Sequence, residues 1–335
     1  MIVSWVRTHG RSKAIAEQLD IPAVFLSEAT ARKPAPSKYL YAAIDTVREV
    51  RRNRPRFIIL MLPPFPLLLL VRVLFPRTPV IGDLHTGVFL NPKWRPFLRP
   101  TLFLLRGGTC VVTNHPLQAR CNRAGLEAIV LHDPLPNSIP EIDRETLSDG
   151  RQVVLCPLGY ANDEPIEELL RAAEDLAADG VQFRLTGRAP GSVKNAAPPN
   201  VKFTGYLTNS DYDAELANCD VVMALTTRDH TMQRAGYEAI AAAKPQVTAD
   251  FKVLRDFHAD AAIYVDPHSH ADIARGVREA LSNSGAITAR VRRRFEQVLA
   301  DQSLAVEELR RAVKSAEGKS NRATGGISRL PWGAS

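Results

Sequence analysis

The sequence predicts an α/β protein with two domains, each a doubly wound parallel β-sheet with helices on its faces. Three observations lead to this fold class. Short apolar and β-branched runs alternate with stretches of helical periodicity along most of the chain, a pattern typical of β-α-β units. The pattern restarts after the proline-rich segment 134–140. The 335 residues also suffice for two domains of ordinary size.

Residues 1–140 are predicted to form the first domain. Its first helix, Ser12–Leu19, has an apolar face that includes Ile15 and Ala16, and Ser12 is the expected N-cap. Further helices fill the gaps between the strands. The expected strands are Ile2–Val6, Ala23–Phe25, Phe57–Leu62, Val80–Asp83, Thr109–Thr113 and Ala128–Leu131.

The longest apolar stretch, Phe57–Phe75, contains three prolines and Arg72. A membrane-spanning helix needs about 20 apolar residues and tolerates charge poorly. We therefore predict a buried strand, a proline-rich turn and a short helix, Leu67–Phe75. Two interpretations of this helix stay open, namely packing in the core or contact with a membrane surface.

Residues 151–285 are predicted to form the second domain, residues 286–316 a C-terminal helical segment, and residues 317–335 a tail without regular structure. The expected strands of the second domain are Val153–Cys156, Gln182–Thr186, Val201–Thr204, Val221–Leu225, Gln246–Thr248 and Ala262–Val265. The expected helices are Pro165–Ala178, Ser210–Asn218, Arg234–Ala243 and Ser269–Ser282.

The net charge of +7 is concentrated at one end, because residues 1–140 hold 19 Lys and Arg against 8 Asp and Glu. Such an excess is typical of a surface that meets phosphate, either in nucleic acid or in anionic lipid headgroups. A solvated basic face is the alternative. The interleaved aromatic and basic residues of RNA-binding sheets are absent, so we predict no nucleic-acid partner.

Several classes of protein are disfavoured by missing motifs. No glycine-rich dinucleotide fingerprint follows either first strand, and no P-loop or nucleophile-elbow sequence occurs. The four cysteines are widely spaced, which indicates neither a zinc site nor a disulfide framework. The first residues lack the features of a signal peptide. We expect a cytoplasmic protein.

Five ordered segments of the second half carry a family resemblance. They are Asn200–Tyr206, Asp211–Asp220, Val221–Thr227, Gly236–Pro245, and Val253–Asp256 with Val265–Pro267. Their order resembles the nucleotide-sugar half of GT-B glycosyltransferases of family 4, the group 1 glycosyl transferases, over about residues 151–282. The resemblance implies two Rossmann-like domains that face each other across a cleft, with the acceptor on the first domain.

The resemblance also implies a donor site. Glu238 matches the second Glu of the family's E-x7-E motif, which holds the donor ribose. An acid that complements the helix dipole is the alternative. Arg234 is expected to neutralise the diphosphate, or to be an ordinary surface arginine. Gly236 lies in the same motif.

The chain departs from the family at the motif's first Glu, which falls on His230. We expect Asp229 or His230 to contact sugar hydroxyls instead, and the stereochemistry of transfer stays open. The family's cationic pair after the first strand is also missing, and Arg188 is the expected substitute. Asp163 and Glu164 are expected to cap a helix rather than bind metal. We predict no metal and no cofactor besides the donor substrate.

In the first domain, His85 ends a strand and resembles the His that many family members direct at the donor sugar. Asp83 is expected either to orient His85 or to act as base toward the acceptor. A His packed under its loop is the alternative. The loop His9–Arg11 is expected on the diphosphate side, where Gly10 allows close approach of the backbone.

The predicted function is transfer of a sugar from a nucleotide-diphosphate sugar to a glycan or polyprenyl-linked acceptor, in cell-surface polysaccharide or glycolipid synthesis. Two alternatives stay open, a nucleotide-sugar epimerase on the same fold and a non-catalytic subunit of a glycan-assembly complex. The basic first half and the helix Leu67–Phe75 together predict a protein attached to the anionic inner face of the cell membrane.

Overall fold

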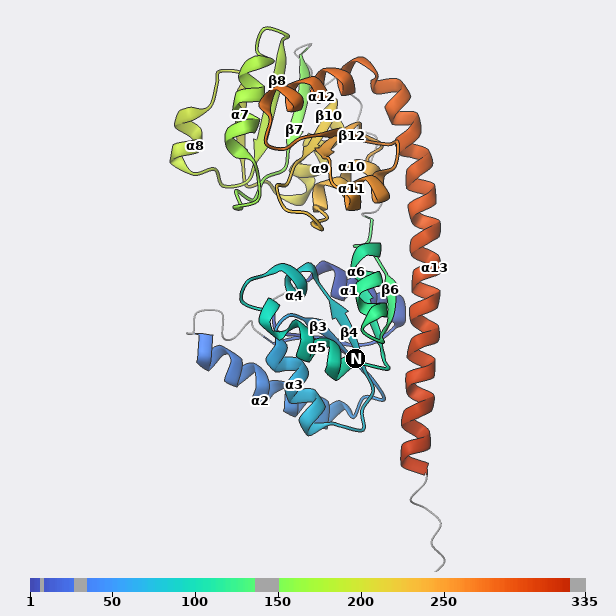
Figure 1. Cartoon of the computed structure of the whole chain (residues 1–335). Coiled ribbons are helices and arrows are strands. Elements are labelled where there is room, and N and C mark those ends of the chain that lie inside the picture. Colours follow the sequence, from blue (N-terminus) through green and yellow to red (C-terminus); the bar gives the residue numbers. More distant parts are fainter. Residues whose placement is uncertain (7–8, 27–34, 136–150, 326–335) are drawn as a thin grey trace, which may run out of the picture. The chain divides into compact units, whose positions relative to one another are not determined.

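The chain folds into two compact units, which we describe separately (Figure 1). The computed structural model describes residues 1–6, 9–26, 35–135 and 151–325. Unit 1 consists of Met1–Pro134 with Asp301–Ser335, and unit 2 of Leu135–Ala300. Most of the predicted linker, residues 136–150, lies outside the described residues.

Unit 1 contains a parallel sheet in the order β2-β1-β3-β4-β5-β6. Its strands are β1 (Ile2–Ser4), β2 (Ala23–Phe25), β3 (Ile58–Leu62), β4 (Val80–Leu84), β5 (Thr109–Val112) and β6 (Glu127–Val130). Its helices are α1 (Gly10–Leu19), α2 (Ala35–Asn53), α3 (Phe65–Leu74), α4 (Thr86–Leu90), η1 (Arg95–Phe97), α5 (Leu98–Leu105) and α6 (His115–Arg123).

Unit 2 contains a second parallel sheet, in the order β12-β11-β10-β7-β8-β9. Its strands are β7 (Gln152–Cys156), β8 (Val181–Thr186), β9 (Val201–Gly205), β10 (Val221–Ala224), β11 (Gln246–Ala249) and β12 (Ile263–Val265). Its helices are α7 (Ile166–Asp175), α8 (Gly191–Ala196), α9 (Asn209–Asn218), α10 (Arg234–Ala241), α11 (Lys252–His258) and α12 (His270–Ser282).

Both sheets are doubly wound, as predicted, which means that helices cover both faces. The strands are accordingly apolar on both faces. In β3, Ile58 and Leu60 belong to one core cluster and Ile59 to another on the opposite face. Such continuous apolar runs are typical of parallel sheets covered by helices on both sides. The strand order reverses between β1 and β3 in unit 1 and between β7 and β10 in unit 2. Ligands of open α/β sheets bind at the carboxyl ends of strands at such points.

The C-terminal helix α13 (Ser284–Gly325) contributes to the cores of both units. Ile287 and Val291 pack in the main core of unit 2, whereas Val306 and Leu309 pack in a core cluster of unit 1. The tail that we predicted from residue 317 is wrong as far as Gly325, because the helix continues to that residue. No proline occurs before Pro331 to stop it. Residues 326–335 lie outside the described part.

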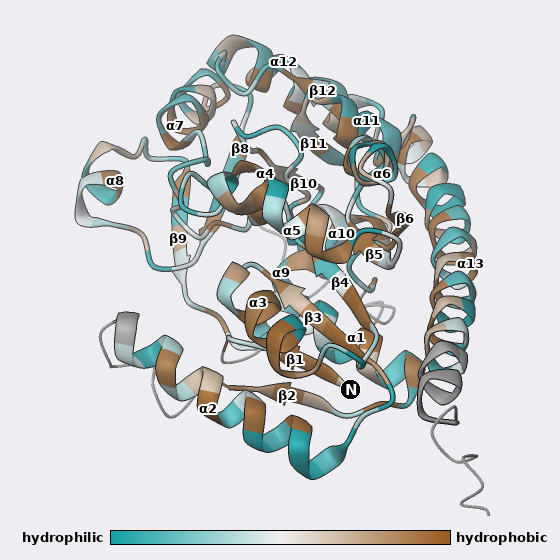
Figure 2. Ribbon diagram, turned by 60° about the horizontal axis from the view of Figure 1, so that its bottom comes forward, coloured by the Kyte–Doolittle hydropathy of each residue, from teal (hydrophilic) through white to brown (hydrophobic). Residues whose placement is uncertain are grey.

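Helix α3 divides its apolar residues between the core and the surface, so packing in the core is confirmed for one face and membrane contact stays a prediction. Leu67, Leu68 and Val71 are fully buried, whereas Leu69 and Val73 expose 44% and 64% of their surface. One face of α3 therefore packs in the core and the other presents hydrocarbon to solvent, and Figure 2 shows the helix in the colour of hydrophobic residues. Among the described helices, none is long and apolar enough to span a bilayer.

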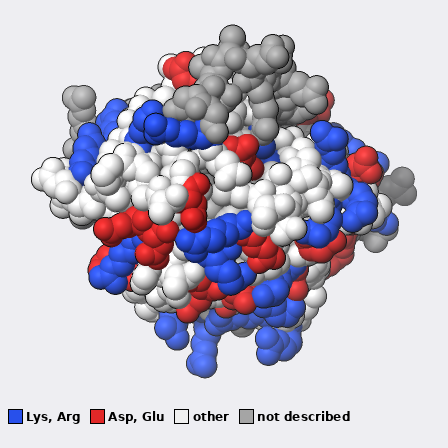
Figure 3. All heavy atoms as spheres, turned by 90° about the horizontal axis from the view of Figure 1, so that it is seen from above, with Lys and Arg blue, Asp and Glu red and all other residues white. Residues whose placement is uncertain are grey.

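On helices α7 and α12 of unit 2, acidic and basic side chains of the same helix form ion pairs. Arg171 pairs with Glu167 on α7, and Arg275 pairs with Asp272 and Glu279 on α12. On the face shown in Figure 3, blue and red side chains are interspersed. The acidic excess of the second half is thus partly balanced locally, in contrast to the basic excess of the first.

Candidate functional site

Three side chains meet at the carboxyl end of β4 in unit 1. Arg11 lies in the first turn of α1, Asp83 lies near the end of β4, and His85 follows that strand. Arg11 Nη2 is 3.1 Å from Asp83 Oδ1, and His85 Nε2 is 3.1 Å from Asp83 Oδ2. Arg11 and Asp83 are buried, whereas the His85 side chain is 19% exposed. The imidazole therefore stands at the sheet edge with a carboxylate behind it.

Asp83 carries a negative charge at neutral pH. Burial alone would raise its pKa, but the charges of Arg11 and His85 and the hydrogen bond with His85 outweigh burial and hold the pKa well below its ordinary value. A carboxylate that resists protonation is a weak proton acceptor. Of the two roles predicted for Asp83, the geometry fits orientation of His85 better than general-base catalysis.

His9 is the N-cap of α1, a position that we predicted for Ser12. The helix begins two residues earlier than expected, because His9 Nδ1 accepts a hydrogen bond from the Ser12 backbone N–H at 3.3 Å. Burial and the neighbouring His85 lower the pKa of His9, which favours the neutral ring that capping requires. The rings of His9 and His85 also pack edge to face, with centroids 4.6 Å apart.

The Arg11 side chain turns into unit 1, and the place of the His9–Arg11 loop on the diphosphate side stays a prediction. The Arg11 guanidinium is buried between Asp83 and Asp133, whose Oδ1 lies 3.8 Å from Nη1. Because a buried arginine needs a partner charge, the carboxylate of Asp83 explains why this side chain turns inward. Gly10 is the first residue of α1, and its contact with the donor stays a prediction.

In unit 2, Asp163 connects the two loops at the point where the strand order reverses. It lies in the loop after β7, and its Oδ2 accepts a hydrogen bond from Thr226 Oγ1 at 3.0 Å. Its backbone carbonyl accepts from the Thr227 backbone N–H at 2.7 Å. Both threonines belong to the loop after β10. The capping role that we expected for Asp163 is wrong, since α7 begins at Ile166 with Pro165 as its N-cap.

Glu164 also folds back on its own loop rather than capping a helix. Its Oε1 accepts from the backbone N–H of Gly159 at 3.0 Å, and its Oε2 from that of Ala161 at 2.7 Å. The sequence did not lead us to predict the contacts that Asp163 and Glu164 make with these loops. For Asp163, the available signal was the pair Thr226–Thr227 just after a buried strand. Within the described ranges, no cluster of three or more His, Cys, Asp or Glu side chains could hold a metal ion.

Glu238 is held in a fixed orientation by two neighbours. Arg234 Nε donates to its Oε1 at 2.6 Å, and Tyr212 Oη donates to its Oε2 at 2.5 Å. Burial and the Glu238 charge raise the pKa of Tyr212, so the phenol stays a donor. A carboxylate offers about four acceptor positions. The two contacts therefore leave capacity for two further hydroxyls, the number in a ribose diol.

Asp229 and His230 lie in the loop between β10 and α10. The His230 backbone N–H donates to Asp229 Oδ1 at 2.6 Å, and His230 has a left-handed φ of 61°. A non-glycine residue with this φ is strained. The loop places both residues after the carboxyl end of β10 in the unit 2 sheet, and their contact with a sugar stays a prediction.

Two further residues predicted to bind the donor, Gly236 and Arg188, lie in helix α10 and after strand β8. Gly236 is buried within α10, where a Cβ would stand 3.1 Å from Gln246 Nε2 and 3.2 Å from His258 Nε2. Its geometry indicates close packing of α10 on the sheet rather than donor contact. Arg188 follows β8 and is exposed, with its guanidinium 5.6 Å from the centroid of the Tyr206 ring. It is the first cation after that strand along the chain.

Residues 151–283 match the family described as "Glycosyl transferases group 1". No curated protein matches the sequence. Among solved structures, the chain is similar to a sucrose-phosphate synthase from Thermosynechococcus elongatus, with a TM-score of 0.72 and 12% identity over 98% of this chain and 100% of that one.

Two other solved structures share the fold. A glycosyltransferase from Rickettsia africae gives a TM-score of 0.67 at 10% identity, over 94% of this chain and 98% of that one. Anabaena Alr3699/HepE in complex with UDP and glucose gives 0.66 at 16% identity, over 92% and 91%. The predicted α/β GT-B fold is therefore confirmed. Residues 151–283 therefore match the group 1 glycosyl transferases, and the whole chain shares the fold of the glycosyltransferase structures that it is similar to.

Proposed function

We propose that this glycosyltransferase moves a sugar from a nucleoside-diphosphate sugar to a lipid-linked acceptor on an anionic membrane surface. The observation that carries the donor half is the orientation of Glu238 by Arg234 and Tyr212, inside the segment that matches the family. A uridine diphosphate donor is the first to test, because a similar structure holds UDP-glucose.

The residues of the donor site divide the work by chemistry. Glu238 accepts from the ribose hydroxyls. The Arg234 side chain is 70% exposed, so the guanidinium nitrogens not engaged with Glu238 can approach the diphosphate. The N-terminus of α10 adds free backbone N–H groups near the same phosphates. Charge that develops on the leaving diphosphate is stabilised by these groups.

His85 acts at the sugar in this proposal, and Asp83 keeps its ring in place. The imidazole nitrogen that Asp83 does not engage, Nδ1, can accept or donate one hydrogen bond to a sugar hydroxyl. This contact would help to position the donor, which is the main source of catalysis expected in such a site.

The membrane half of the proposal is supported by charge and exposure. The exposed arginines Arg51, Arg95 and Arg99 form no ion pair within the described part of unit 1. The outer face of α3, in the same unit, exposes hydrocarbon at Leu69 and Val73. Stable attachment of a peripheral protein needs two such signals, electrostatic and apolar.

The test of the donor site compares Glu238→Gln with Glu167→Gln. Glutamine keeps an acceptor for Tyr212 but removes the charge that binds Arg234 and the ribose. Glu167 forms an equivalent i,i+4 pair with Arg171 outside the predicted site. We expect the first variant to weaken binding of UDP-glucose about tenfold to a hundredfold, measured by calorimetry, because hydrogen bonds to a charged group contribute about 1.5–3 kcal/mol. The control should bind normally.

Transfer itself is tested by donor turnover with and without a lipid-phosphate acceptor. An acceptor-dependent release of nucleoside diphosphate supports the proposal. Isomerisation of the donor sugar without release would assign an epimerase, and binding without either reaction would assign a non-catalytic subunit.

A further inference from the structure

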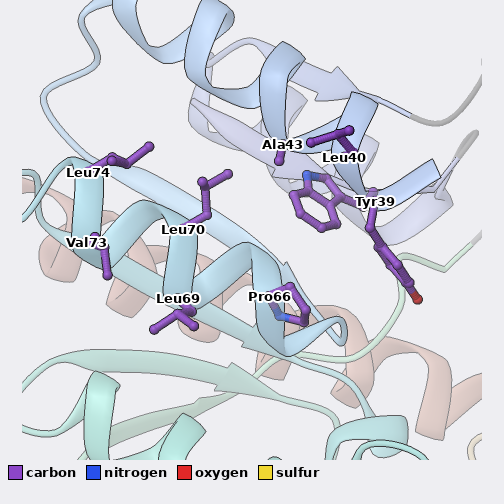
Figure 4. A pocket seen from close by; sticks show the side chains of 9 residues that line it. Tyr39, Leu40, Ala43, Pro66, Leu69, Leu70, Val73 and Leu74 are labelled. Atoms are coloured by element: carbon purple, nitrogen blue, oxygen red, sulfur yellow. The ribbon is translucent and has the colours of Figure 1, made fainter. Parts of the chain in front are cut away.

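An apolar groove of about 480 Å³ lies between α2 and α3 in unit 1 (Figure 4). In Figure 4, side chains of the two helices line this space from opposite sides. The lining residues are Trp5, Tyr39, Leu40, Ala43, Pro66, Leu69, Leu70, Val73 and Leu74. Its volume falls within the range of small-molecule sites, and hydrocarbon lines almost all of it.

The groove begins at the sheet edge that carries the His85 cluster. Trp5 directly follows β1 and Pro66 lies in the first turn of α3, just after β3, so both stand at carboxyl ends of strands. The backbone N–H of His85 donates to the carbonyl of Leu62, the last residue of β3, at 3.0 Å. From this edge the groove follows α3 toward Leu74 at the opposite end of the helix.

A lysine lies beside Tyr39, one of the residues that line the groove, and contacts aromatic rings. Lys93 Nζ donates to Tyr39 Oη at 3.1 Å and lies 4.8 Å from the centroid of the Trp94 ring. Tyr39 in turn packs on Trp5, with centroids 5.8 Å apart. Within the described part of the chain, no carboxylate pairs with Lys93. Its charge is therefore available to an anion at this position.

We propose that this groove holds the hydrocarbon chain of the lipid-linked acceptor, with the adjoining phosphate on Lys93. The inference rests on the proposed function and specifies its acceptor. One occupant satisfies all three observations, namely an apolar lining, a cation beside Tyr39 with which no described carboxylate pairs, and a groove that begins at the sheet edge carrying His85. Burial of the chain would also cover Leu40 and Val73, which expose 61% and 64% of their surface.

The experiment measures binding of soluble alkyl phosphates of increasing length by the fluorescence of Trp5. Of the three tryptophans, Trp94 and Trp332 are replaced by phenylalanine, so that the signal comes from the groove. We expect affinity to rise about fourfold for each added methylene, the factor that corresponds to about 0.8 kcal/mol of buried CH₂. Alkyl alcohols of the same length should bind more weakly.

Two variants locate the ligand. Lys93→Gln should abolish the preference for phosphate over alcohol while the dependence on chain length persists. Ala43→Phe should fill the groove and remove the dependence on chain length. Leu304→Phe is the control, because Leu304 is 69% exposed on α13 and lies outside the groove. Folding of each variant is checked by thermal unfolding.

The outcomes separate this inference from the proposed function. Affinity that is independent of chain length overturns the groove assignment, even if the enzyme transfers sugar to soluble acceptors. Length-dependent binding in a protein that transfers no sugar would keep the groove and overturn the function. A dimer that Leu40→Glu converts to monomers would show that a second copy of the chain occupies the groove, and would overturn the inference.

Discussion

At the residue scale, the candidate site depends on side chains whose charge is set by their neighbours. Asp83 and His85 were both named as candidates from the sequence, because they stand at the carboxyl end of a predicted strand, and their contact with substrate stays a prediction. The inward turn of Arg11 could not be predicted, since nothing in the sequence shows that a buried carboxylate lies opposite it. The orientation of Glu238 by Tyr212 was also out of reach, because these residues come from different helices, α9 and α10.

We predict that His85→Ala lowers kcat at least tenfold and changes donor affinity little. The side chain contacts the sugar in the proposed arrangement, so its loss affects positioning in the transition state more than binding of the nucleotide. Steady-state kinetics and calorimetry with the same donor separate the two effects. His115→Ala, an exposed histidine at the start of α6, is the matched control. Equal losses in affinity and kcat/KM would instead place His85 in substrate binding.

A second residue-scale prediction concerns pH and His258. This side chain is fully buried, and burial lowers its pKa to about 3 from an ordinary value near 6.5. The unfolded chain thus binds one more proton than the folded protein between these two values. The free energy of unfolding should fall as pH is lowered through this window, by up to about 1.4 kcal/mol per pH unit from this residue.

His258→Gln tests that prediction, because glutamine does not titrate. Urea unfolding of both proteins from pH 7 to pH 4 should show a shallower decline for the variant. His268→Gln is a control at a solvent-exposed histidine and should leave the slope unchanged. Parallel pH profiles for the wild type and His258→Gln would mean that this histidine is protonated in the folded protein.

At the element scale, nearly every predicted strand coincides with an observed one to within one or two residues, because the strands of a doubly wound sheet are apolar on both faces. Helix starts were harder to predict. The N-caps of α1 and α7 were both assigned to the wrong residue. Ser12 and Asp163 are residue types that can cap a helix, but the local backbone geometry decides which residue does so. The short helices α8 and α11 carry too little periodicity to be distinguished from loops.

The loop after β8 provides an element-scale prediction. Gly187 has a φ of 83°, and a Cβ at this position would lie 2.2 Å from the carbonyl oxygen of Leu158. Gly180, before β8, has a similar φ of 74° with nothing within 4 Å. Gly180→Ala should therefore cost about 1 kcal/mol through backbone strain alone. Gly187→Ala should cost clearly more, about 2–4 kcal/mol, because the backbone must also move.

Urea unfolding of the two glycine variants checks this difference, with far-UV circular dichroism as the signal. Equal midpoints for both variants would show that the loop after β7 yields without cost. We also expect Gly187→Ala to lose donor binding. Leu158 lies in the same loop as Asp163, and Asp163 holds the loop after β10, which contains the predicted donor residues Asp229 and His230.

At the scale of the whole molecule, the division into two units was predicted, whereas the course of the C-terminal helix was not. The alternation of strand and helix patterns begins again near residue 151, and this can be recognised in the sequence. The sequence of α13, by contrast, contains two apolar faces in succession, and only the structure shows that residues after Asp301 pack in unit 1. Long-range packing of this kind leaves no local signal.

Membrane attachment is the prediction that belongs to the whole chain. On α3, Leu68 is fully buried, whereas Leu69 and Val73 are exposed. A charge at Leu68 would therefore unfold the protein and report nothing about membranes. The informative variants are Leu69→Glu and Val73→Glu, with Leu304→Glu on α13 as a control at another exposed leucine.

Flotation with liposomes of graded anionic lipid content then measures attachment. Binding should rise with anionic lipid, because the net positive charge lies mainly in residues 1–140, and it should weaken as salt shortens the range of these charges. The two α3 variants should bind several-fold less at every lipid composition, since they bring an acidic group to the apolar face. The control should float like the wild type. A protein that stays at the bottom of the gradient with anionic liposomes in low salt would not attach to membranes, and its exposed arginines would then serve a soluble phosphorylated acceptor.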